Sequence, residues 1–275
     1  MKKWYAVIGD PITHSLSPFM HDTWFRDHGI DASYVPIRVE PANLEKAFES
    51  LKLLGVSGFN ITLPHKQSII PFLDQLDDTA LKMNAVNTVV CDGQQYAGFN
   101  TDGDGFVRSL LTHPVDRNDQ LLVIGAGGAA RGIVHALKRA GFHHVTIANR
   151  TFRRAEELAE ETESAAITMA DAESSLADFN IIVQTTSVGL SKDEALPLSL
   201  DRLKEGAVVA DIIYNPLTTS FLQAAKEKNC TIVNGVGMFV YQGAIAFEKW
   251  TGVEPDTEKM IQLITEKLGG TYVNR

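Results

Sequence analysis

Apolar runs and amphipathic stretches alternate along the first third of the chain. Three runs rich in β-branched and aromatic residues predict strands. Between them, two amphipathic stretches predict helices, each with a proline near its start and a glycine at its end. The strands are expected at residues 4–10, 34–39 and 56–62, and the helices at 17–29 and 41–55. This order predicts βαβ units and a mostly parallel sheet.

The pattern changes after residue 84. Residues 85–100 read as two strands around Asp92-Gly93, a pair favoured in tight hairpins. A polar, proline-containing break at 112–119 is the best candidate linker. Beyond it, strands and helices alternate as in a doubly wound sheet, and two amphipathic helices follow at 237–252 and 256–270. We expect these last helices to pack back on the first domain.

A glycine-rich turn stands at the start of this second α/β region. The stretch LLVIGAGGAARG at 121–132 places Gly125, Gly127 and Gly128 between a strand and an alanine-rich helix. Glycines let the backbone approach a pyrophosphate, and the free amides of the helix N-terminus face its charge. Ala130 stands at the third glycine position, which the fingerprint permits. The turn therefore predicts a dinucleotide site, although a tight turn without a ligand has the same pattern.

The end of the next strand bears on the choice of dinucleotide. An NAD site normally has an acidic residue there to accept from the ribose, and this chain has Asn149-Arg150-Thr151 with Arg153 and Arg154. Guanidinium groups match a phosphate in charge and in geometry, so these arginines favour NADP. The alternative is that they are solvated charges at a helix start, where the helix dipole disfavours cations.

Composition narrows the class of partner. The 275 residues are 44% hydrophobic, with a net charge of -9 and a pI near 5.4. The chain has no run of five or more like charges, so its charge pattern does not indicate binding to nucleic acid or to a membrane. The expected partner is therefore a small molecule. Cys91 and Cys230 form no CxxC motif, and the histidines show no metal-ligand spacing, so no metal is expected. The N-terminal apolar run is too short for a signal peptide, which favours the cytoplasm. The sequence leaves open whether the chain forms a homodimer.

Small polar side chains cluster at the predicted strand ends of the first domain. They lie at residues 13–18, 60–62, 84–88 and 100–102. In an open α/β sheet the carboxyl ends of strands form the ligand crevice, and these groups suit a ligand with several hydroxyls. Each also has a structural interpretation: Ser17 and Asp102 as helix caps, Asn60 as the end of a strand, and Asn87 as a turn residue.

Lys66 with Asp102 is the pair suited to acid–base work beside a nicotinamide. Reduction of a ketone needs a proton on the new alkoxide, which an ammonium can donate. On residues alone, Lys66 fits a solvated surface lysine better than a catalyst. His14 and His65 lie near the predicted crevice, but a lone histidine is more often a structural hydrogen-bonding residue, so both stay outside the catalytic set.

Several stretches, taken together, resemble the shikimate dehydrogenases. They are Ser15-Leu16-Ser17-Pro18, NITLPHK at 60–66, AVNT at 85–88, GFNTDGDG at 98–105, GAGGAARG at 125–132, NRTFRRA at 149–155, DIIYNP at 211–216 and NGVGMFVYQGA at 234–244. The match runs along the whole chain in order. The glycine turn is common to many dehydrogenases, but the serine pair, NITLPHK and NTDGDG are specific to this family.

The resemblance implies NADP-dependent interconversion of 3-dehydroshikimate and shikimate, a step in aromatic amino-acid biosynthesis. It implies that Lys66 is the acid–base residue and Asp102 its partner. The substrate contacts carried over by motif are Ser15, Ser17, Asn60, Thr62, Asn87, Asp102, Tyr214 and Gln242. The cofactor contacts carried over are Gly125, Ala126, Gly127, Gly128, Ala129, Asn149, Arg150, Thr151, Arg154, Ile212, Gly235 and Met238, with Asp78 as a looser match.

The implied fold is a two-domain α/β enzyme with the active site in a cleft. Residues 1–103 plus 238–275 would form the substrate-binding catalytic domain, and residues 104–237 a Rossmann-like NADP domain. Two positions depart from the family pattern. Asn84 replaces a glycine before AVNT, and Asn tolerates left-handed backbone. Gly243 replaces the alanine after Gln242, at a cost on the order of 1 kcal/mol of helix stability.

Three alternatives remain. A quinate/shikimate dehydrogenase of the same fold would use NAD or accept quinate, and Arg150 with Arg154 argues against NAD. A methylenetetrahydrofolate dehydrogenase shares the two-domain plan and a catalytic lysine, but the serine pair and NTDGDG do not fit a pterin pocket. A non-catalytic NADP-binding sensor would have no reason to keep Lys66 and Asp102.

Overall fold

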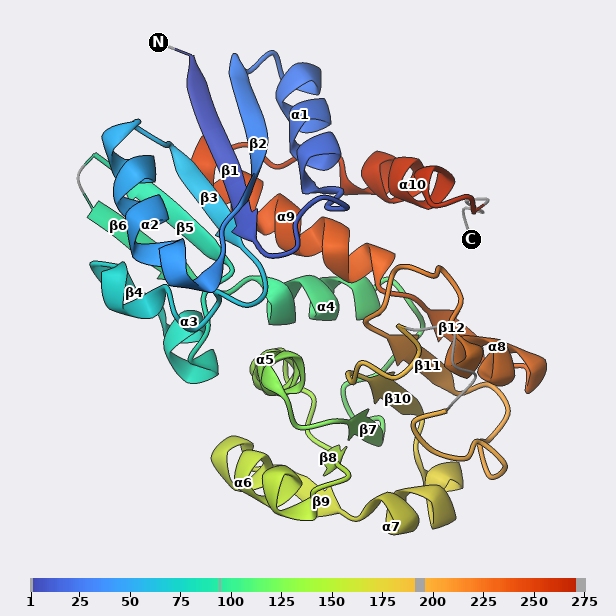
Figure 1. Cartoon of the computed structure of the whole chain (residues 1–275). Coiled ribbons are helices and arrows are strands. Elements are labelled where there is room, and N and C mark those ends of the chain that lie inside the picture. The colour runs from blue at the N-terminus through green and yellow to red at the C-terminus, as the bar shows by residue number, and fades with distance from the viewer. Residues whose placement is uncertain (1, 94, 191–195, 271–275) are drawn as a thin grey trace. The chain divides into compact units, whose positions relative to one another are not determined.

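The computed structural model describes residues 2–93, 95–190 and 196–270 (Figure 1). The chain divides into two compact units. Unit 1 comprises Met1–Thr101 and Gln242–Met260, and unit 2 comprises Asp102–Tyr241 and Ile261–Arg275. The two-domain α/β class expected from the sequence is confirmed. The predicted domain limits at 103/104 and 237/238 stay a prediction.

Unit 1 contains a mixed sheet with the strand order β2-β1-β3-β5-β6-β4. Its strands are β1 (Lys3–Gly9), β2 (Ala32–Arg38), β3 (Gly58–Ile61), β4 (Gln75–Leu76), β5 (Thr88–Asp92) and β6 (Gln95–Phe99). β1 pairs in parallel with β2 and β3, and β4 pairs in parallel with β6. β5 is antiparallel to β3 and β6. Asp92 pairs with Gln95, and Gly93 has a φ of 69°, so the predicted hairpin is confirmed.

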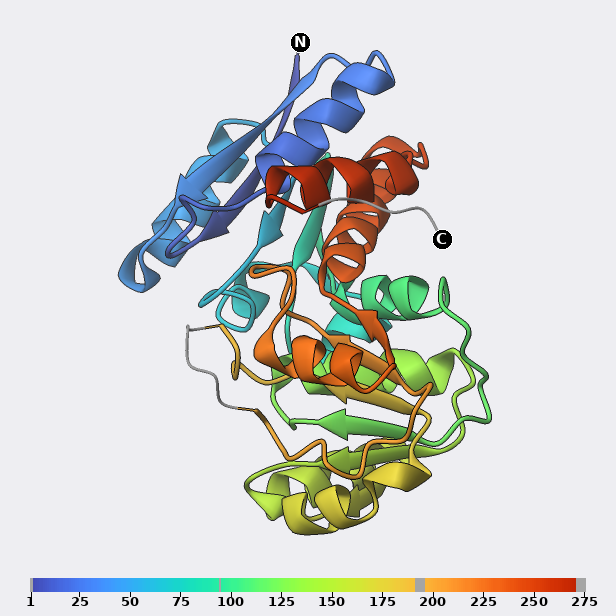
Figure 2. The same cartoon turned by 90° about the vertical axis from the view of Figure 1, so that its right-hand side faces the viewer.

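Helices cover both faces of this sheet (Figure 2). They are α1 (Ser17–Asp27), α2 (Leu44–Leu53) after the short helix η1 (Pro41–Asn43), η2 (Ile70–Phe72), α3 (Asp78–Met83) and the second part of α9 (Val236–Thr251). β1 alternates between the faces: Ala6 and Ile8 join the core under α2, whereas the Tyr5 ring stacks on Trp250 of α9. Trp250 Nε1 donates to the Val89 carbonyl (2.9 Å), so α9 packs on the first domain as expected.

Unit 2 contains a parallel sheet with the order β12-β11-β10-β7-β8-β9. Its strands are β7 (Leu121–Ile124), β8 (Val145–Ala148), β9 (Ala165–Ile167), β10 (Ile181–Gln184), β11 (Val208–Asp211) and β12 (Thr231–Val233). Its helices are α4 (Asp102–Leu110), α5 (Gly128–Arg139), α6 (Phe152–Thr162), α7 (Met169–Ser174), η3 (Leu176–Asp178) and α8 (Ser220–Glu227), and α10 (Thr257–Lys267) spans the unit limit. The direction of strand succession reverses between β7 and β10, which is where doubly wound sheets bind ligands.

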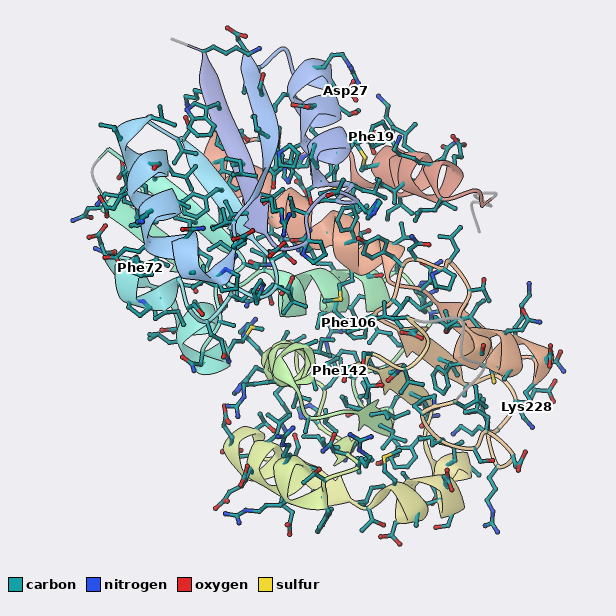
Figure 3. The ribbon with its side chains drawn as sticks, viewed as in Figure 1. Phe19, Asp27, Phe72, Phe106, Phe142 and Lys228 are labelled. Carbon is teal, nitrogen blue, oxygen red and sulfur yellow. The ribbon has the colours of Figure 1, made fainter. Side chains whose placement is uncertain are left out.

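The helix α4 belongs to the core of unit 2. Its Phe106 lies with Phe142 in one buried cluster (Figure 3). A Cβ at Gly103 would lie 2.3 Å from the Gly132 carbonyl oxygen, so α4 contacts the backbone of α5 closely. Residues 112–119, predicted as a linker, follow α4 and precede β7 within unit 2. The linker prediction is therefore wrong, because the helix before it packs with the domain after it.

Across the described ranges, no helix is both long enough and apolar enough to cross a membrane.

Candidate functional site

Four polar segments of unit 1 meet at one edge of its sheet. The parallel register of β1 and β3 (Ile8 with Ile61) brings the C-terminal ends of these strands together. β5 is antiparallel, so its start lies at the same edge, where Thr88 pairs with Asn60. β6 ends there as well, because the backbone amide of Asn87 donates to the Phe99 carbonyl (3.0 Å). The predicted convergence follows from this register.

Asn60 is held by three hydrogen bonds within unit 1. Its Nδ2 donates to the Asn87 carbonyl (3.0 Å) and to Thr88 Oγ1 (3.0 Å). This fixes Oδ1 as the acceptor for the hydroxyl of Tyr34 (2.6 Å). The hydroxyl proton of Tyr34 is thereby used in this bond. Burial raises the pKa of Tyr34 well above its usual range, and the polar side chain of Ser17 opposes this rise.

A second network joins Asn87, Thr101 and Gln242, three residues far apart in sequence. Asn87 Nδ2 donates to Thr101 Oγ1 (2.9 Å) and, at 3.5 Å, to Oε1 of Gln242. Asn87 Oδ1 accepts from the Thr101 amide (2.9 Å), and Thr101 Oγ1 donates to the Gln242 carbonyl (3.0 Å). Together, the two networks link Asn60, Asn87 and Gln242, three of the residues expected to contact substrate.

Ser15 and Thr62 lie beside this set. Ser15 Oγ accepts from the Ser17 amide (3.3 Å) at the start of α1. The helix α1 has Leu16 as its N-cap and Ser17 as its first residue, so the capping interpretation of Ser17 is wrong. Thr62 directly follows β3, and a Cβ at Gly9 would lie 2.3 Å from its methyl group, so glycine is required for this close contact.

Lys66 stands in the turn after β3, half-buried. Its carbonyl accepts from the Val86 amide (2.7 Å), which ties the turn to the segment before β5. Asp102 is the first residue of α4 in unit 2, so it lies within that helix and is not its N-cap. The pairing of Lys66 with Asp102 stays a prediction. Asp78, the loosest cofactor assignment, is exposed in the first turn of α3, also in unit 1.

The glycine turn of unit 2 has the features that a pyrophosphate site needs. Gly125 has a φ of 116°, and a Cβ there would lie 2.4 Å from Thr185 Oγ1. Gly127 and Gly128 are exposed, without positive φ, and a Cβ at either would meet no protein atom within 4 Å. The fold therefore does not demand glycine at these two positions, whereas close approach of a ligand does. Gly127 caps α5 without a side-chain hydrogen bond, and Ala126 and Ala129 complete the turn.

The residues assigned to the adenosine phosphate adjoin this turn. β7 and β8 pair in parallel, and the Gly125 amide donates to the Ala148 carbonyl (2.8 Å). The segment that begins at Asn149 therefore lies beside the glycine turn. Asn149 Nδ2 donates to the Thr151 carbonyl (2.9 Å). Arg153 is paired with Glu157 (3.0 Å). The guanidinium groups of Arg150 and Arg154 are exposed and show no ion pair within the described part of the chain. They fit a phosphate that arrives with a ligand.

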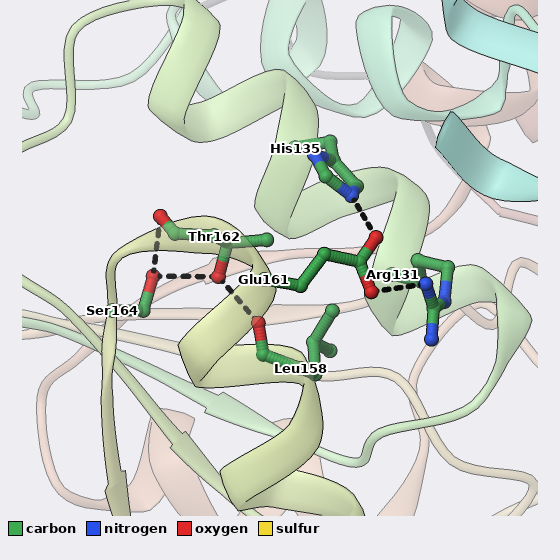
Figure 4. A network of polar contacts seen from close by, with 6 residues as sticks. All are labelled: Arg131, His135, Leu158, Glu161, Thr162 and Ser164. Atoms are coloured by element: carbon green, nitrogen blue, oxygen red, sulfur yellow. Dashed lines mark hydrogen bonds and ion pairs between the residues drawn. The ribbon is translucent and has the colours of Figure 1, made fainter. Parts of the chain in front are cut away.

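A polar contact set fixes α6 against α5 (Figure 4). Glu161 of α6 accepts from Arg131 and from Nε2 of His135 (2.8 Å), both on α5. Thr162 Oγ1 donates to the Leu158 carbonyl (2.7 Å) one turn earlier. Arg131 is thereby engaged with Glu161. These contacts hold the helix that carries Arg154 against the helix that begins at the glycine turn.

Two stretches of unit 2, one after β11 and one after β12, carry the residues expected near the nicotinamide. A Cβ at Gly235 would lie 2.1 Å from the Ile212 carbonyl oxygen, and the Gly235 amide donates to the Ile213 carbonyl (2.9 Å). Ile212 and Met238 both pack on the core cluster that contains Phe142. The ring of Tyr214, an expected substrate contact, stacks on Phe239 with centroids 5.0 Å apart.

Asp211 fixes the stretch after β11 at Ile213 and at Thr219. Its Oδ1 accepts from the Ile213 amide (3.0 Å) and its Oδ2 from the Thr219 hydroxyl (2.8 Å). Burial raises the pKa of Asp211 to about 6, and the hydrogen bonds from Ile213 and Thr219 oppose the rise. Sequence reasoning assigned no individual role to Asp211, Tyr34 or Thr101, although Thr101 belongs to the polar stretch 100–102 expected at the crevice. Asp211 and Thr101 belong to the quoted DIIYNP and GFNTDGDG stretches, whereas Tyr34 had no motif to point to it.

In the part of the chain that the structure describes, no group of three or more histidine, cysteine, aspartate or glutamate residues could hold a metal ion.

Family models match most of the chain in three consecutive segments. Residues 7–89 match the shikimate dehydrogenase substrate-binding domain, and residues 112–213 match the shikimate/quinate 5-dehydrogenase model. Residues 235–265 match the shikimate 5′-dehydrogenase C-terminal domain. A curated NADP(+)-dependent shikimate dehydrogenase from Lysinibacillus sphaericus is 52% identical over 98% of this chain and 100% of its own length. The chain belongs to the shikimate dehydrogenase family.

Solved structures of shikimate dehydrogenases share the fold. The Thermus thermophilus enzyme in complex with NADP(H) and shikimate is 35% identical, with a TM-score of 0.89 over 97% of this chain and 99% of that one. The Listeria monocytogenes enzyme in complex with shikimate and NAD is 32% identical, with a TM-score of 0.88 over 97% and 96%. The resemblance drawn from the motifs is thus confirmed along the whole chain.

Proposed function

We propose that this protein catalyses the reversible, NADP-dependent reduction of 3-dehydroshikimate to shikimate, a step of aromatic amino-acid biosynthesis. Similarity over the full length to curated enzymes of that name supports this reaction. The observation that carries the proposal is the linked set Asn60, Asn87, Thr101 and Gln242 at one sheet edge of unit 1. Hydroxyl and carboxamide groups suit a ring that carries several hydroxyls.

Unit 2 supplies the cofactor-binding residues. The exposed turn Gly125–Ala129 and the N-terminus of α5 would receive the pyrophosphate. Arg150 and Arg154 would bind the 2′-phosphate, with Asn149 and Thr151 beside them, and Ile212, Gly235 and Met238 would lie near the nicotinamide. NADPH, when bound, supplies the hydride that reduces the ring ketone. Asp78, which belongs to unit 1, is the weakest of these assignments.

Lys66 is the acid–base residue of the proposal. In reduction, its ammonium donates a proton to the oxygen of the ketone as negative charge develops there. In oxidation, the amine accepts the proton from the hydroxyl. Asp102 would hold the ammonium in place. Ser15, Thr62 and Tyr214 would complete the contacts to substrate.

Arginine side chains decide between this proposal and its nearest alternative, an NAD-using quinate/shikimate dehydrogenase. The Listeria enzyme crystallised with NAD shows that NAD can bind on this fold. In the present chain Asn149, not a carboxylate, directly follows β8. Arg150 and Arg154, a few residues further on, form no ion pair with any described residue. We therefore expect kcat/KM to be much higher with NADPH than with NADH, and higher with shikimate than with quinate. Equal values with the two cofactors would contradict this assignment.

The cellular setting is also a proposal. The free thiols of Cys91 and Cys230 fit a reducing compartment, and we propose the cytoplasm.

The decisive experiment measures NADPH oxidation with 3-dehydroshikimate for the wild type and for Lys66→Ala. We expect turnover to fall at least about 100-fold with little change in KM, because a proton donor is removed while binding groups remain. Lys82→Ala removes the same charge from an exposed site on α3 and should keep wild-type turnover. An inactive wild type would support the non-catalytic sensor, and an unchanged Lys66→Ala rate would remove Lys66 from the mechanism.

A further inference from the structure

His65, the residue before Lys66, is buried and hydrogen-bonded. Its side chain is 1% exposed, and Nε2 lies 2.6 Å from the Val39 carbonyl oxygen. A carbonyl oxygen can only accept, so Nε2 carries the hydrogen and donates it. The imidazole therefore makes a directed bond from the lysine-bearing turn to another segment.

The acceptor, Val39, is itself fixed to the sheet. It directly follows β2, and its amide donates to the carbonyl of Gly9, the last residue of β1 (3.1 Å). The turn after β3 is bonded to β1 as well: the Thr62 amide donates to the Ile8 carbonyl (2.9 Å). The His65 bond thus adds β2 to the strands that hold this turn.

The opposite side of the turn is also anchored. The Lys66 carbonyl accepts from the Val86 amide (2.7 Å), and the His65 carbonyl accepts from the Ile69 amide (3.1 Å). The backbone of Lys66 is therefore held from both directions, by the imidazole of His65 and by Val86. A lysine side chain has four rotatable bonds, so a displacement of its backbone directly displaces its ammonium. An acid–base group must lie within hydrogen-bond reach of the reacting oxygen, and small misplacements cost much rate.

We propose that His65 is a positioning residue for Lys66, and that its Nε2–H bond to the Val39 carbonyl holds the turn that presents the acid–base ammonium. This inference rests on the proposed function. It assigns a role in the reaction to a histidine that sequence reasoning placed outside the catalytic set.

Three substitutions of His65 distinguish a role in positioning Lys66 from a general effect of changing a buried side chain. His65→Leu and His65→Asn both remove the bond, because Leu has no donor and the amide of Asn is too short to reach Val39. His65→Gln keeps an N–H donor close to the place of Nε2. His21→Phe is the matched control, since His21 is also fully buried in unit 1 but makes no hydrogen bond with any described residue.

The expected result is a loss confined to kcat. For His65→Leu and His65→Asn, kcat should fall about 10- to 100-fold, while the KM values for shikimate and NADP stay within about threefold. His65→Gln should recover most of kcat, and His21→Phe should keep it. Comparable melting temperatures for His65→Asn and His65→Gln would assign the difference to the hydrogen bond.

A double-mutant cycle gives the sharpest test. If His65 acts through Lys66, adding His65→Asn to Lys66→Ala should reduce kcat by less than about threefold further. Losses that multiply would overturn the proposal, as would a wild-type kcat in His65→Asn or a rise in KM equal to the loss in kcat. Failure of the proposed function is distinguishable, because the wild type itself would then not oxidise shikimate.

Discussion

The imidazole of His21 stacks on the phenol ring of Tyr34, with centroids 4.5 Å apart and planes inclined by 10°. Rings of Trp24, Phe247 and Trp250 surround it, and neither ring nitrogen has a hydrogen-bond partner among the described residues. Burial lowers the pKa of His21 to about 3. A histidine is thus enclosed as a neutral aromatic ring, directly behind the tyrosine that bonds Asn60.

This enclosure predicts a stability that depends on pH. The folded protein keeps His21 neutral down to about pH 3, whereas the unfolded chain protonates it below about pH 6.5. Its contribution to the free energy of unfolding therefore falls as pH drops through this window, by about 1.4 kcal/mol per pH unit and on the order of 5 kcal/mol in total.

His21→Phe should remove that dependence. The variant should match or exceed the wild-type stability at pH 7, because no unpaired ring nitrogens are buried, and its advantage should grow by about 2 kcal/mol at pH 5. Urea unfolding followed by tryptophan fluorescence reports on unit 1, where Trp24 and Trp250 contact His21. The exposed His28 gives the control His28→Phe, which should keep the wild-type slope. Parallel pH curves for His21→Phe and wild type would refute the prediction.

The carboxyl group of Asp211 should change the free energy of unfolding with pH in the direction opposite to His21. Its pKa is raised by burial to about 6 in the folded state, so the folded protein binds this proton more tightly than the unfolded chain. The resulting stability is present below about pH 4 and lost as pH rises through 6, a change of about 3 kcal/mol.

Asp211→Asn keeps an acceptor for the Ile213 amide and does not titrate. The difference in opening free energy, variant minus wild type, should rise by about 3 kcal/mol between pH 4 and pH 8. Hydrogen exchange of the β10 and β11 amides measures it locally. Asp201→Asn, at an exposed position, should show no such rise. If the difference in opening free energy for Asp211→Asn did not change with pH, burial would not raise the pKa of this carboxyl group.

Arg150 should contribute to affinity for NADPH specifically. Its guanidinium is exposed and, within the described residues, makes no ion pair. Arg150→Ala should weaken NADPH binding by roughly 1.5 to 3 kcal/mol, the loss of one charge-assisted contact, and leave NADH binding unchanged. Arg153→Ala is the matched control, because Arg153 is already paired with Glu157. Titration calorimetry with both nucleotides decides, and an equal loss for NADH would place Arg150 away from the 2′-phosphate.

Local backbone requirements were predictable from the sequence. Asn84 was expected to tolerate a left-handed backbone, and it ends α3 with a φ of 47°. The glycine turn was predicted from one strand, three glycines and one helix, and Gly125 has the positive φ that such a turn uses. These features depend on residues close in sequence, so their physical cause can be read directly from the chain.

Long-range contacts were not predictable in the same way. The bond from Tyr34 to Asn60 depends on the register of β2 and β3 against β1, and the bond from His65 to Val39 depends on how three strands end. Ser17 was considered as a helix cap because of its residue type, yet Leu16 occupies that position. Residue type predicts which side chains can bond, whereas register decides which of them meet.

Gly243, one of the two departures from the family pattern, lies against the side chain of Met20. A Cβ at Gly243 would lie 2.1 Å from the terminal methyl carbon of Met20 and 3.2 Å from its sulfur, and Met20 is fully buried. Helix propensity alone predicts that Gly243→Ala stabilises α9 by about 1 kcal/mol. The contact predicts the opposite, a loss of about 1 to 3 kcal/mol, because the Met20 methyl has to move within a packed core.

The side chain of Met20 provides the control for this last prediction. In a Met20→Leu background the terminal methyl is absent, so Gly243→Ala should recover the helix propensity and become neutral or stabilising by up to about 1 kcal/mol. Urea unfolding of the four proteins gives the coupling energy between the two sites, which we expect to exceed about 1 kcal/mol. Additive effects, or a stabilising Gly243→Ala in the wild type, would show that Met20 is not the reason for glycine at this position.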